Sequence, residues 1–138
     1  MKYSIITINY NNADGLRRTI ESVVSQTYTD YEYLIIDGGS TDTSVDIIKE
    51  YEDKISYWVS EKDGGIYNAM NKGVKVAHGE YLIFMNSGDV FYNNRVIERI
   101  ESSQRTDDII VGRVLTSEGQ EFMHQPHQLT MYFLYSST

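Results

Sequence analysis

Apolar runs typical of β-strands alternate with stretches of helical periodicity along the chain. The runs are short and rich in Ile, Val, Tyr and Phe, and they cover 3–8, 31–37, 55–60, 80–85 and 108–115. Between them, apolar residues recur three or four positions apart, which predicts helices over 16–24, 42–51, 66–77 and 93–103. Because strand and helix alternate without a hairpin, the pattern predicts an α/β fold with an open, mainly parallel sheet and helices on both faces.

The last segment, 112–138, departs from this alternation. It holds the single proline of the sequence and an apolar, helix-like stretch that stops at Thr138 without a polar cap. We therefore expect 1–138 to be one truncated domain, in which 1–111 forms the core of alternating strands and helices and 112–138 begins a further region. An apolar surface left uncovered there could drive self-association.

Composition narrows the classes of function. The 138 residues carry a formal net charge of −8 and no cysteine, which excludes disulfides and thiolate metal sites and argues against nucleic-acid binding. The sequence has no signal-peptide pattern and no apolar run that could span a membrane, so we expect a cytoplasmic protein. The motifs GxxxxGK[ST], GxGxxG, HExxH and GxSxG are missing, which excludes the usual nucleotide, zinc-protease and serine-hydrolase signatures.

Polar residues gather where the predicted strands end. In an open parallel sheet, ligands bind beyond the carboxyl ends of the strands. Tyr10 follows the first strand and could stack on a nucleobase. Asp37 ends the second strand and could accept a hydrogen bond from an imide N–H, such as that of uracil. Asp89 follows the fourth strand and could coordinate Mg²⁺ or Mn²⁺ together with two phosphate groups.

Structural roles compete with each of these interpretations. Asp37 could cap a turn, Asp89 could cap the helix that follows, and Tyr10 is one of 12 tyrosines. Asp63 could close the turn before two glycines, and Asn71 could satisfy backbone groups of its own helix or loop. The residue types alone leave both readings open.

Taken together and in order, several stretches resemble the family-two inverting glycosyltransferases with the A-type fold. They read YSIITINYNN, SVVSQTYTDYEYLIIDGGSTDTS and DGGIYNAMNKGVKVAHGEYLIFMNSGD. The resemblance implies a Rossmann-like sheet, with Tyr10 beside the base of a nucleotide sugar and Asp37 as the acid that reads it. It also implies that Asp63 and Asn71 belong to the segment behind the donor sugar and diphosphate.

The resemblance bears on the metal site as well. The family's metal-binding stretch commonly reads Asp-x-Asp-Asp, whereas this sequence has Asn86, Ser87, Gly88 and Asp89 at that place. It therefore implies that Asp89 alone supplies the carboxylate for Mg²⁺ or Mn²⁺, and that Asn86 and Ser87 lie against the nucleotide.

By this resemblance, the chain would transfer a sugar from a nucleoside diphosphate sugar, a UDP sugar in particular, to a saccharide or lipid-linked acceptor with inversion. The segment 112–138 would then begin the acceptor side. No residue corresponds to the family's general base, which we expect beyond Thr138, so this chain could bind the donor without catalysing transfer. A bacterial polysaccharide pathway and peripheral membrane association of the full-length protein are analogies with the family.

Two other classes of function remain open. The chain could be a non-catalytic nucleotide-binding module that uses the same strand ends to hold a ligand. It could also be a structural or interaction protein in which these polar residues form turns only.

Overall fold

The computed structural model describes residues 2–103, 109–111, 113–115, 121–123 and 133–136. In chain order, the elements are β1 (Tyr3–Asn9), α1 (Ala13–Val24), β2 (Tyr31–Asp37), α2 (Ser44–Glu50), a 3-10 turn (Glu52–Lys54), β3 (Tyr57–Ser60), α3 (Ile66–Val76), β4 (Tyr81–Phe84), α4 (Val96–Ser102), β5 (Ile109–Val111), β6 (Arg113–Leu115), β7 (Glu121–Met123) and β8 (Phe133–Ser136). None of the helices in these ranges is long and apolar enough to cross a bilayer.

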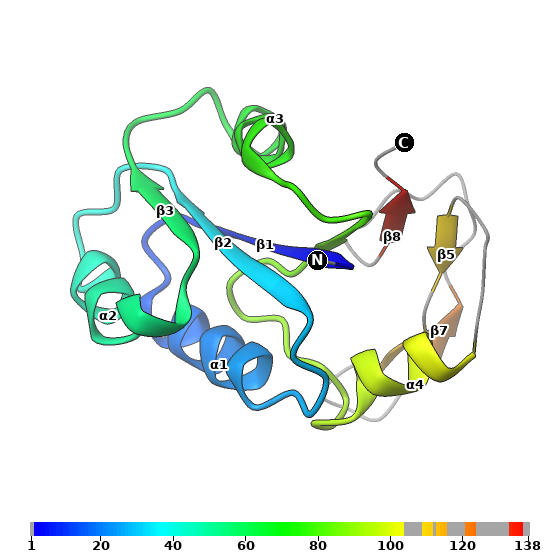
Figure 1. The fold of residues 1–138 in the computed structure, drawn as a ribbon. Coiled ribbons are helices and arrows are strands. Elements are labelled where there is room, and N and C mark those ends of the chain that lie inside the picture. Colours follow the sequence, from blue (N-terminus) through cyan, green and yellow to red (C-terminus); the bar gives the residue numbers. More distant parts are fainter. Residues whose placement is uncertain (1, 104–108, 112, 116–120, 124–132, 137–138) are drawn as a thin grey trace.

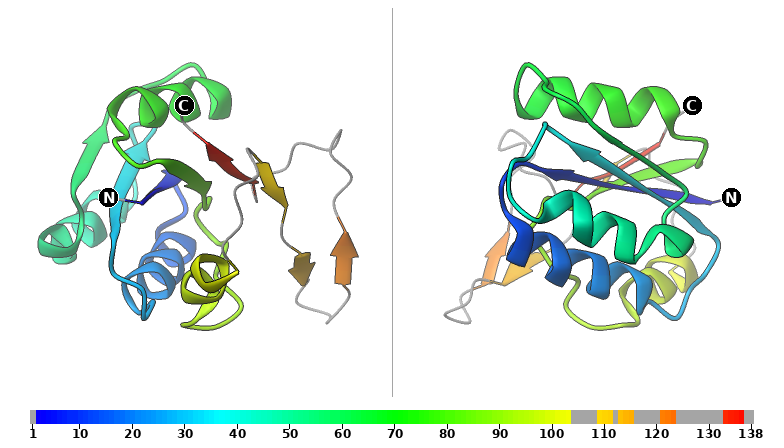
Figure 2. Two further views of the ribbon diagram at one scale, coloured as in Figure 1. Left: turned by 45° about the vertical axis from the view of Figure 1, so that its right-hand side comes forward. Right: turned by 90° about the vertical axis from the view of Figure 1, so that its left-hand side faces the viewer.

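A six-stranded sheet forms the centre of the molecule. Its strand order is β3-β2-β1-β4-β8-β5. The strands β1 to β4 are parallel to one another, whereas β8 runs antiparallel to both β4 and β5. Helix α3 covers one face, and α1, α2 and α4 lie on the other (Figures 1 and 2). The predicted mainly parallel sheet with helices on both faces is confirmed.

The later part of the chain differs from the sequence prediction in two ways. The single strand predicted over 108–115 is wrong, because β5 joins the main sheet while β6 pairs with β7 in a separate two-stranded sheet. Gly112 separates the two in the sequence, and glycine weakens the interior of a strand. The helix-like reading of the tail is wrong at β8, which is a strand.

Pairing explains the conformation of β8. Its sequence FLYS is apolar and aromatic, and such residues adopt the strand conformation when a neighbouring strand is open for pairing. Strand β4 offers such an edge, and β8 pairs with it over three residues. The main sheet therefore extends past the boundary that we expected at residue 111, and the division of the chain into two regions stays a prediction.

Strand β1 is buried along its whole length, which explains its continuous apolar sequence. Ile5 faces the cluster formed with α1, α2 and α4, while Ile6 faces the cluster formed with α3. Gly73 lets α3 approach the sheet closely, because a Cβ atom there would lie 2.6 Å from Ile6 Cγ2. The short distance between α3 and the sheet thus depends on this glycine. Ile66, at the first turn of the helix, is exposed.

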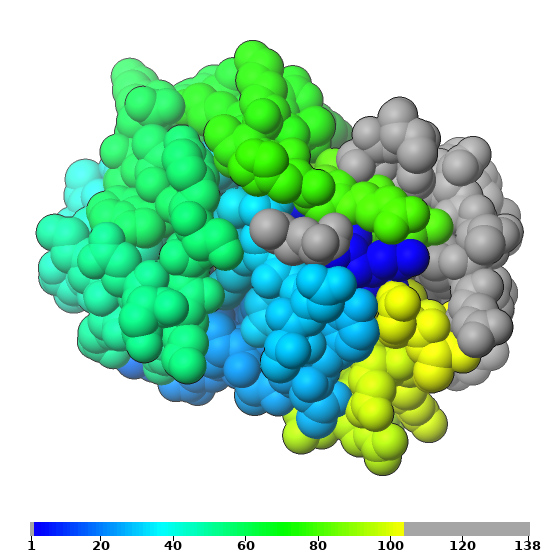
Figure 3. Space-filling view, in the orientation of Figure 1, coloured from blue at the N-terminus to red at the C-terminus, as the bar shows by residue number. Residues whose placement is uncertain are grey.

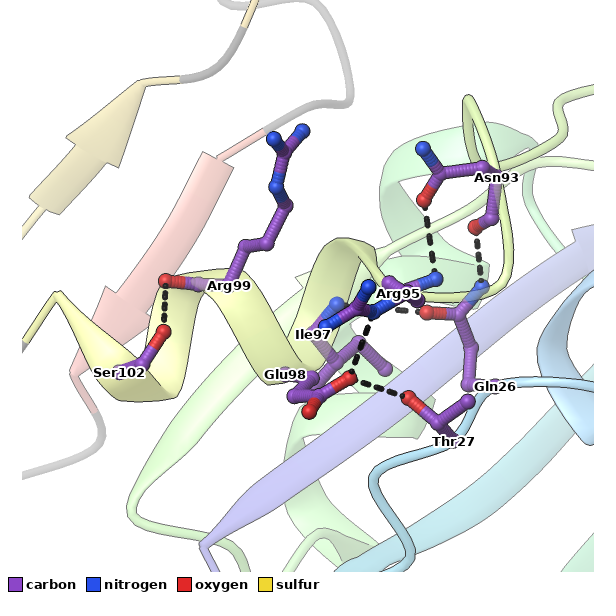
Figure 4. A network of polar contacts seen from close by, with 8 residues as sticks. All are labelled: Gln26, Thr27, Asn93, Arg95, Ile97, Glu98, Arg99 and Ser102. Atoms are coloured by element: carbon purple, nitrogen blue, oxygen red, sulfur yellow. Dashed lines mark hydrogen bonds and ion pairs between the residues drawn. The ribbon is translucent and has the colours of Figure 1, made fainter.

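Helix α4 begins three residues later than the sequence indicates, because the preceding residues make a turn held by side chains (Figure 4). Asn93 Oδ1 accepts from the backbone N–H of Arg95 at 2.9 Å. The buried Gln26 amide donates to the Asn93 carbonyl at 2.7 Å and accepts from the backbone N–H of Ile97 at 3.3 Å. One glutamine therefore joins the end of α1 to the start of α4.

The amino edge of the sheet contains a buried acid. Figure 3 shows the segment around 78–81 lying next to the start of β1 at this edge. The Glu32 carboxylate accepts from Ser4 Oγ at 2.6 Å and from the backbone N–H of His78, and Gly79 N donates to Ser4 Oγ at 2.7 Å. Burial alone would raise the pKa of Glu32, but these hydrogen bonds outweigh it and lower the pKa. This network fastens the turn before β4 to β1 and β2.

Candidate functional site

The carboxyl ends of β1, β2 and β3 lie in register. Asn9 is paired with Asp37, and Asp37 with Ser60. The backbone ladder continues one step further, since Gly38 N donates to the Asn9 carbonyl at 2.9 Å. The side chains that follow these strands are thereby brought to one edge of the sheet, as the sequence predicted.

Asp37 is fully buried at this edge and binds the loops around it. Its Oδ1 accepts from Asn9 Nδ2 at 2.7 Å and from Ser40 Oγ at 2.6 Å. Its Oδ2 accepts from the backbone N–H of Ser40 at 2.8 Å and from Ser60 Oγ at 2.7 Å. Burial would raise the pKa of this carboxyl, but the hydrogen bonds from Ser40, Ser60 and Asn9 lower it below its usual value. The predicted contact of Asp37 with a base stays a prediction.

The β1–α1 loop is braced on both sides by consecutive asparagines. Asn11 Oδ1 accepts from the backbone N–H of Thr41 at 2.8 Å, in the β2–α2 loop. Asn12 Nδ2 donates to the Ser87 carbonyl at 3.2 Å, in the loop after β4. Asn11 has a φ of +47°, a left-handed conformation that asparagine tolerates better than most residues. These contacts join three loops into one unit.

The loop after β4 holds the predicted metal-binding stretch. Asp89 Oδ2 accepts from the backbone N–H of Asn86 at 3.1 Å, which closes a tight turn. Gly88 occupies this turn with a φ of +101°, a conformation that favours glycine. The buried hydroxyl of Thr19 accepts from Gly88 N at 2.9 Å and donates to the Asp89 carbonyl at 2.7 Å. Helix α1 therefore fixes the position of this loop.

Asp63 reaches from the β3–α3 loop to the end of β2. Its Oδ2 lies 3.0 Å from the position that a Cβ atom on Gly38 would take. Its Oδ1 accepts from the backbone N–H of Gly65 at 3.0 Å, so the acid does close the turn before α3. The next polar side chain, Asn68, accepts from Gly64 N at 3.1 Å.

The remaining predicted residues differ in how they join this edge. Tyr10 follows Asn9 at the end of β1, and its side chain is 64% exposed, so its face is available to a ligand. Ser87 continues the ladder, since its N–H donates to the Ile8 carbonyl at 3.0 Å. Asn71 is exposed on α3.

Sequence reasoning missed the residues that position the site, namely Ser40, Ser60, Asn12 and Thr19. Thr19 carried a usable signal, because it is a polar residue next to Ile20 on the apolar face of a predicted helix. The two serines carried none, since a serine after a strand is ordinary turn chemistry.

The donor set suits a hard cation only in part. Among the described residues there is no group of three or more His, Cys, Asp or Glu that could hold a metal ion. Asn86 Oδ1 is buried with no hydrogen-bond partner in the described part of the chain, and it lies in the same turn as the Asp89 carboxylate. Mg²⁺ commonly takes one or two protein oxygens together with substrate phosphates, so Asn86 and Asp89 fit such an ion.

The fold and this edge define a glycosyltransferase A-type architecture. The sequence model of the family Glycosyl transferase family 2 matches residues 4–137, and the chain belongs to this family. An uncharacterized glycosyltransferase of Mycobacterium tuberculosis is 45% identical over 95 residues, which cover 68% of this chain and 36% of that protein. The chain thus spans about a third of the length of this relative.

Solved structures share the fold. TarS of Staphylococcus aureus (residues 1–349), in complex with UDP-GlcNAc, superposes with a TM-score of 0.86 at 20% identity, covering 99% of this chain and 46% of that one. The mannosyltransferase PcManGT of Pyrobaculum calidifontis, in complex with GDP-Man and Mn²⁺, gives a TM-score of 0.70 at 18% identity, covering 83% and 34%. At these identities, the likeness establishes the architecture.

Proposed function

We propose that this chain is the donor-binding part of a glycosyltransferase that uses a nucleoside diphosphate sugar, in particular a UDP sugar. The observation that carries this proposal is the braced carboxyl edge, where hydrogen bonds join the loops after β1, β2 and β4. Family membership supports the same reaction class. The TarS structure supports the choice of donor, because it contains UDP-GlcNAc in the same fold.

The nucleotide would lie across the ends of β2, β1 and β4. Tyr10 would stack on the base, because its exposed ring follows β1 directly. Asp37 would keep the base-side loops in place through Ser40 and Ser60. Asn86 and Ser87 would lie beside the diphosphate. Asn71 would approach the nucleotide from α3, and Asp63 would approach it from the β3–α3 loop.

A divalent cation, Mg²⁺ or Mn²⁺, would neutralise the charge that develops on the departing diphosphate. The Asp89 carboxylate and Asn86 Oδ1 would hold this cation. Asp89 is the acid of the turn over 86–89, and Asn86 Oδ1 is buried there without a hydrogen-bond partner in the described part of the chain. Thr19 would preserve this turn by binding both Gly88 and the Asp89 backbone.

Transfer would proceed by a single displacement. The acceptor hydroxyl, on a saccharide or lipid-linked sugar, would lose its proton to a general base and bond to the anomeric carbon as the bond to the diphosphate breaks. Attack from the face opposite the diphosphate inverts the anomeric centre. We assign the base to none of the residues described. A bacterial polysaccharide would be the product class.

Calorimetric titration of the chain with UDP, with and without Mn²⁺, tests this proposal. We expect UDP to bind and Mn²⁺ to tighten binding at least tenfold, because Asp89 would supply a charged oxygen ligand to a cation that neutralises the diphosphate. Asp89→Asn should remove the effect of Mn²⁺, since the amide lacks the charge. Asp53→Asn, the same change at an exposed position, should leave it intact.

Three results would contradict the proposal. Absence of UDP binding to the wild-type chain would overturn it altogether. Equal binding with and without Mn²⁺ would exclude the metal, and an Asp89→Asn variant that keeps the Mn²⁺ effect would exclude Asp89 as its ligand.

A further inference from the structure

A carboxylate from another loop lies against the residue that follows β2. Residue 38 follows Asp37 at the sheet edge and is glycine. Asp63, from the β3–α3 loop, places Oδ2 3.0 Å from the point where a side chain of residue 38 would begin. The backbone of Gly38 is not in the left-handed region, so its lack of a side chain serves to make room for Asp63.

The other acids at this end of β2 are already engaged. Asp37 is fully buried, and both of its oxygens accept hydrogen bonds from protein donors. Asp42 uses one oxygen for the backbone N–H of Ala13 and the other for that of Ser44. Glu61 pairs with Lys72 at 3.0 Å. Asp37 therefore cannot accept from a ligand without giving up a partner, whereas Asp42 and Glu61 keep acceptor capacity that these contacts leave open.

Asp63 has a free acceptor in the right place. Its Oδ1 is held by Gly65 N at 3.0 Å, which fixes the side chain, and no donor from the described part of the chain reaches Oδ2. The register pairs Asn9 with Asp37, so Gly38 and the residue after Asn9 both follow the last pair of the β1–β2 ladder. That residue is Tyr10, whose ring is mostly exposed. An exposed ring after β1 and a carboxylate oxygen after β2 therefore lie at neighbouring strand ends.

We propose that Asp63, held against Gly38, is the residue that selects the nucleobase, and that Asp37 only positions the loops around it. This inference rests on the proposed function. A carboxylate oxygen accepts from an imide N–H, as at N3 of uracil, and repels the lone pair at N3 of cytosine. The site would therefore prefer uridine over cytidine diphosphates, and the discrimination would come from the loop after β3.

Binding of UDP and CDP to variants of the chain tests this assignment. Asp63→Asn keeps an acceptor for Gly65 N but loses the charge, and we expect the preference for UDP over CDP to fall at least tenfold. Gly38→Ala should lower the preference in the same direction without any change of charge, because its Cβ would lie 3.0 Å from Asp63 Oδ2 and the carboxylate would have to shift. Gly64→Ala is the matched control, since its Cβ would make only ordinary contact, 3.5 Å from Asn68 Cβ.

Asp37→Asn separates the two roles. We expect this substitution to lower the melting temperature and to weaken the binding of UDP and of CDP by similar factors. It disturbs the hydrogen bonds from Ser40 and Ser60 but leaves Asp63 in place. An Asp63→Asn variant with the wild-type preference, or an Asp37→Asn variant that alone loses it, would overturn the assignment. A wild-type chain that binds neither nucleotide would overturn the proposed function as well, so the two failures can be told apart.

Discussion

Asn11 and Asn12 are neighbours in the chain, yet their side chains bind loops on opposite sides of β1. Asn11 accepts from Thr41 after β2, and Asn12 donates to Ser87 after β4. Strand β1 lies between β2 and β4, so the loop that follows it has the loops after those two strands on its two sides. Two short amides thereby set the spacing of the loops proposed to hold the base and the diphosphate.

Replacing Asn11 should separate the cost of its backbone conformation from that of its hydrogen bond. Asn11→Gly loses the bond to Thr41 but accepts a φ of +47°, whereas Asn11→Ala loses the bond and is strained as well. We expect Asn11→Ala to have a free energy of unfolding about 1 kcal/mol below that of Asn11→Gly. Urea denaturation measures both, and equal stability of the two variants would contradict the strain.

Asp37 should make the fold sensitive to acid. Its pKa is lower in the folded chain than the ordinary value of 3.8, so its contribution is complete above that pH and is lost as pH falls through the folded pKa. Asp37→Asn should lower the free energy of unfolding at pH 7 by about 2–4 kcal/mol, because an amide N–H₂ then faces the donors of Ser40 or Ser60.

Denaturation curves between pH 2 and about 6 check the sign of this effect. The loss of stability below about pH 4 should be shallower in Asp37→Asn than in the wild type. Asp53→Asn, at an exposed position, should follow the wild-type curve. A parallel decline in all three proteins would show that Asp37 is not a source of the acid sensitivity.

Thr19 should affect the metal-binding turn more than the rest of the site. Thr19→Val keeps the shape of the side chain but removes the bonds to Gly88 and Asp89, which should cost about 1–2 kcal/mol of unfolding free energy. In UDP titrations, the gain from Mn²⁺ should shrink by a larger factor than metal-free binding, because Asp89 lies in the turn that Thr19 holds. Thr19→Ser retains the hydroxyl and serves as the control, and a Thr19→Val variant in which metal-free binding falls while the Mn²⁺ gain is kept would contradict this role.

Gly73 should resist substitution in spite of its place in a helix. Alanine favours the helix over glycine by about 1 kcal/mol, but overpacking a core costs about 1–3 kcal/mol. The new Cβ would lie 2.6 Å from Ile6 Cγ2 in a fully buried side chain, so we expect Gly73→Ala to be destabilising by about 1 kcal/mol. Thermal and urea unfolding measure the change.

A double-mutant cycle tests the stated cause. In an Ile6→Ala background the crowded methyl group is gone, so Gly73→Ala should become neutral or stabilising. An equal loss of unfolding free energy in both backgrounds would mean that the added methyl group does not clash with Ile6.

The sequence was informative about the parallel half of the fold because those strands are buried on both faces. Strand β1 contains Ile5, Ile6 and Ile8 within four residues, a run that is typical of a central strand or a buried helix. The strand ends were recognisable for the same reason, since polar residues begin where burial ends. Asp37 and Asp89 could therefore be assigned to one edge of the sheet before their partners were known.

Partners were much harder to infer, because they depend on residues distant in the chain. Glu32 is a charged residue within a buried strand, and nothing near it in the sequence points to Ser4 or His78. The number of donors on Asp37 was equally hidden, although it decides whether the carboxylate is available to a ligand. The prediction of a helix-like tail was wrong at β8 for a related reason, since pairing with the open edge of β4 determines the conformation of this segment.

The place of β8 has a consequence for biosynthesis. Strands β1 to β4 leave the ribosome first, and their sheet then ends at β4 with unpaired backbone groups. That edge stays open for pairing until Phe133–Ser136 emerges and pairs with it, and β5 joins the main sheet by pairing with β8. Translation that halts between α4 and β8 would therefore yield a nascent chain prone to pair with other chains, so β8 protects this edge against aggregation.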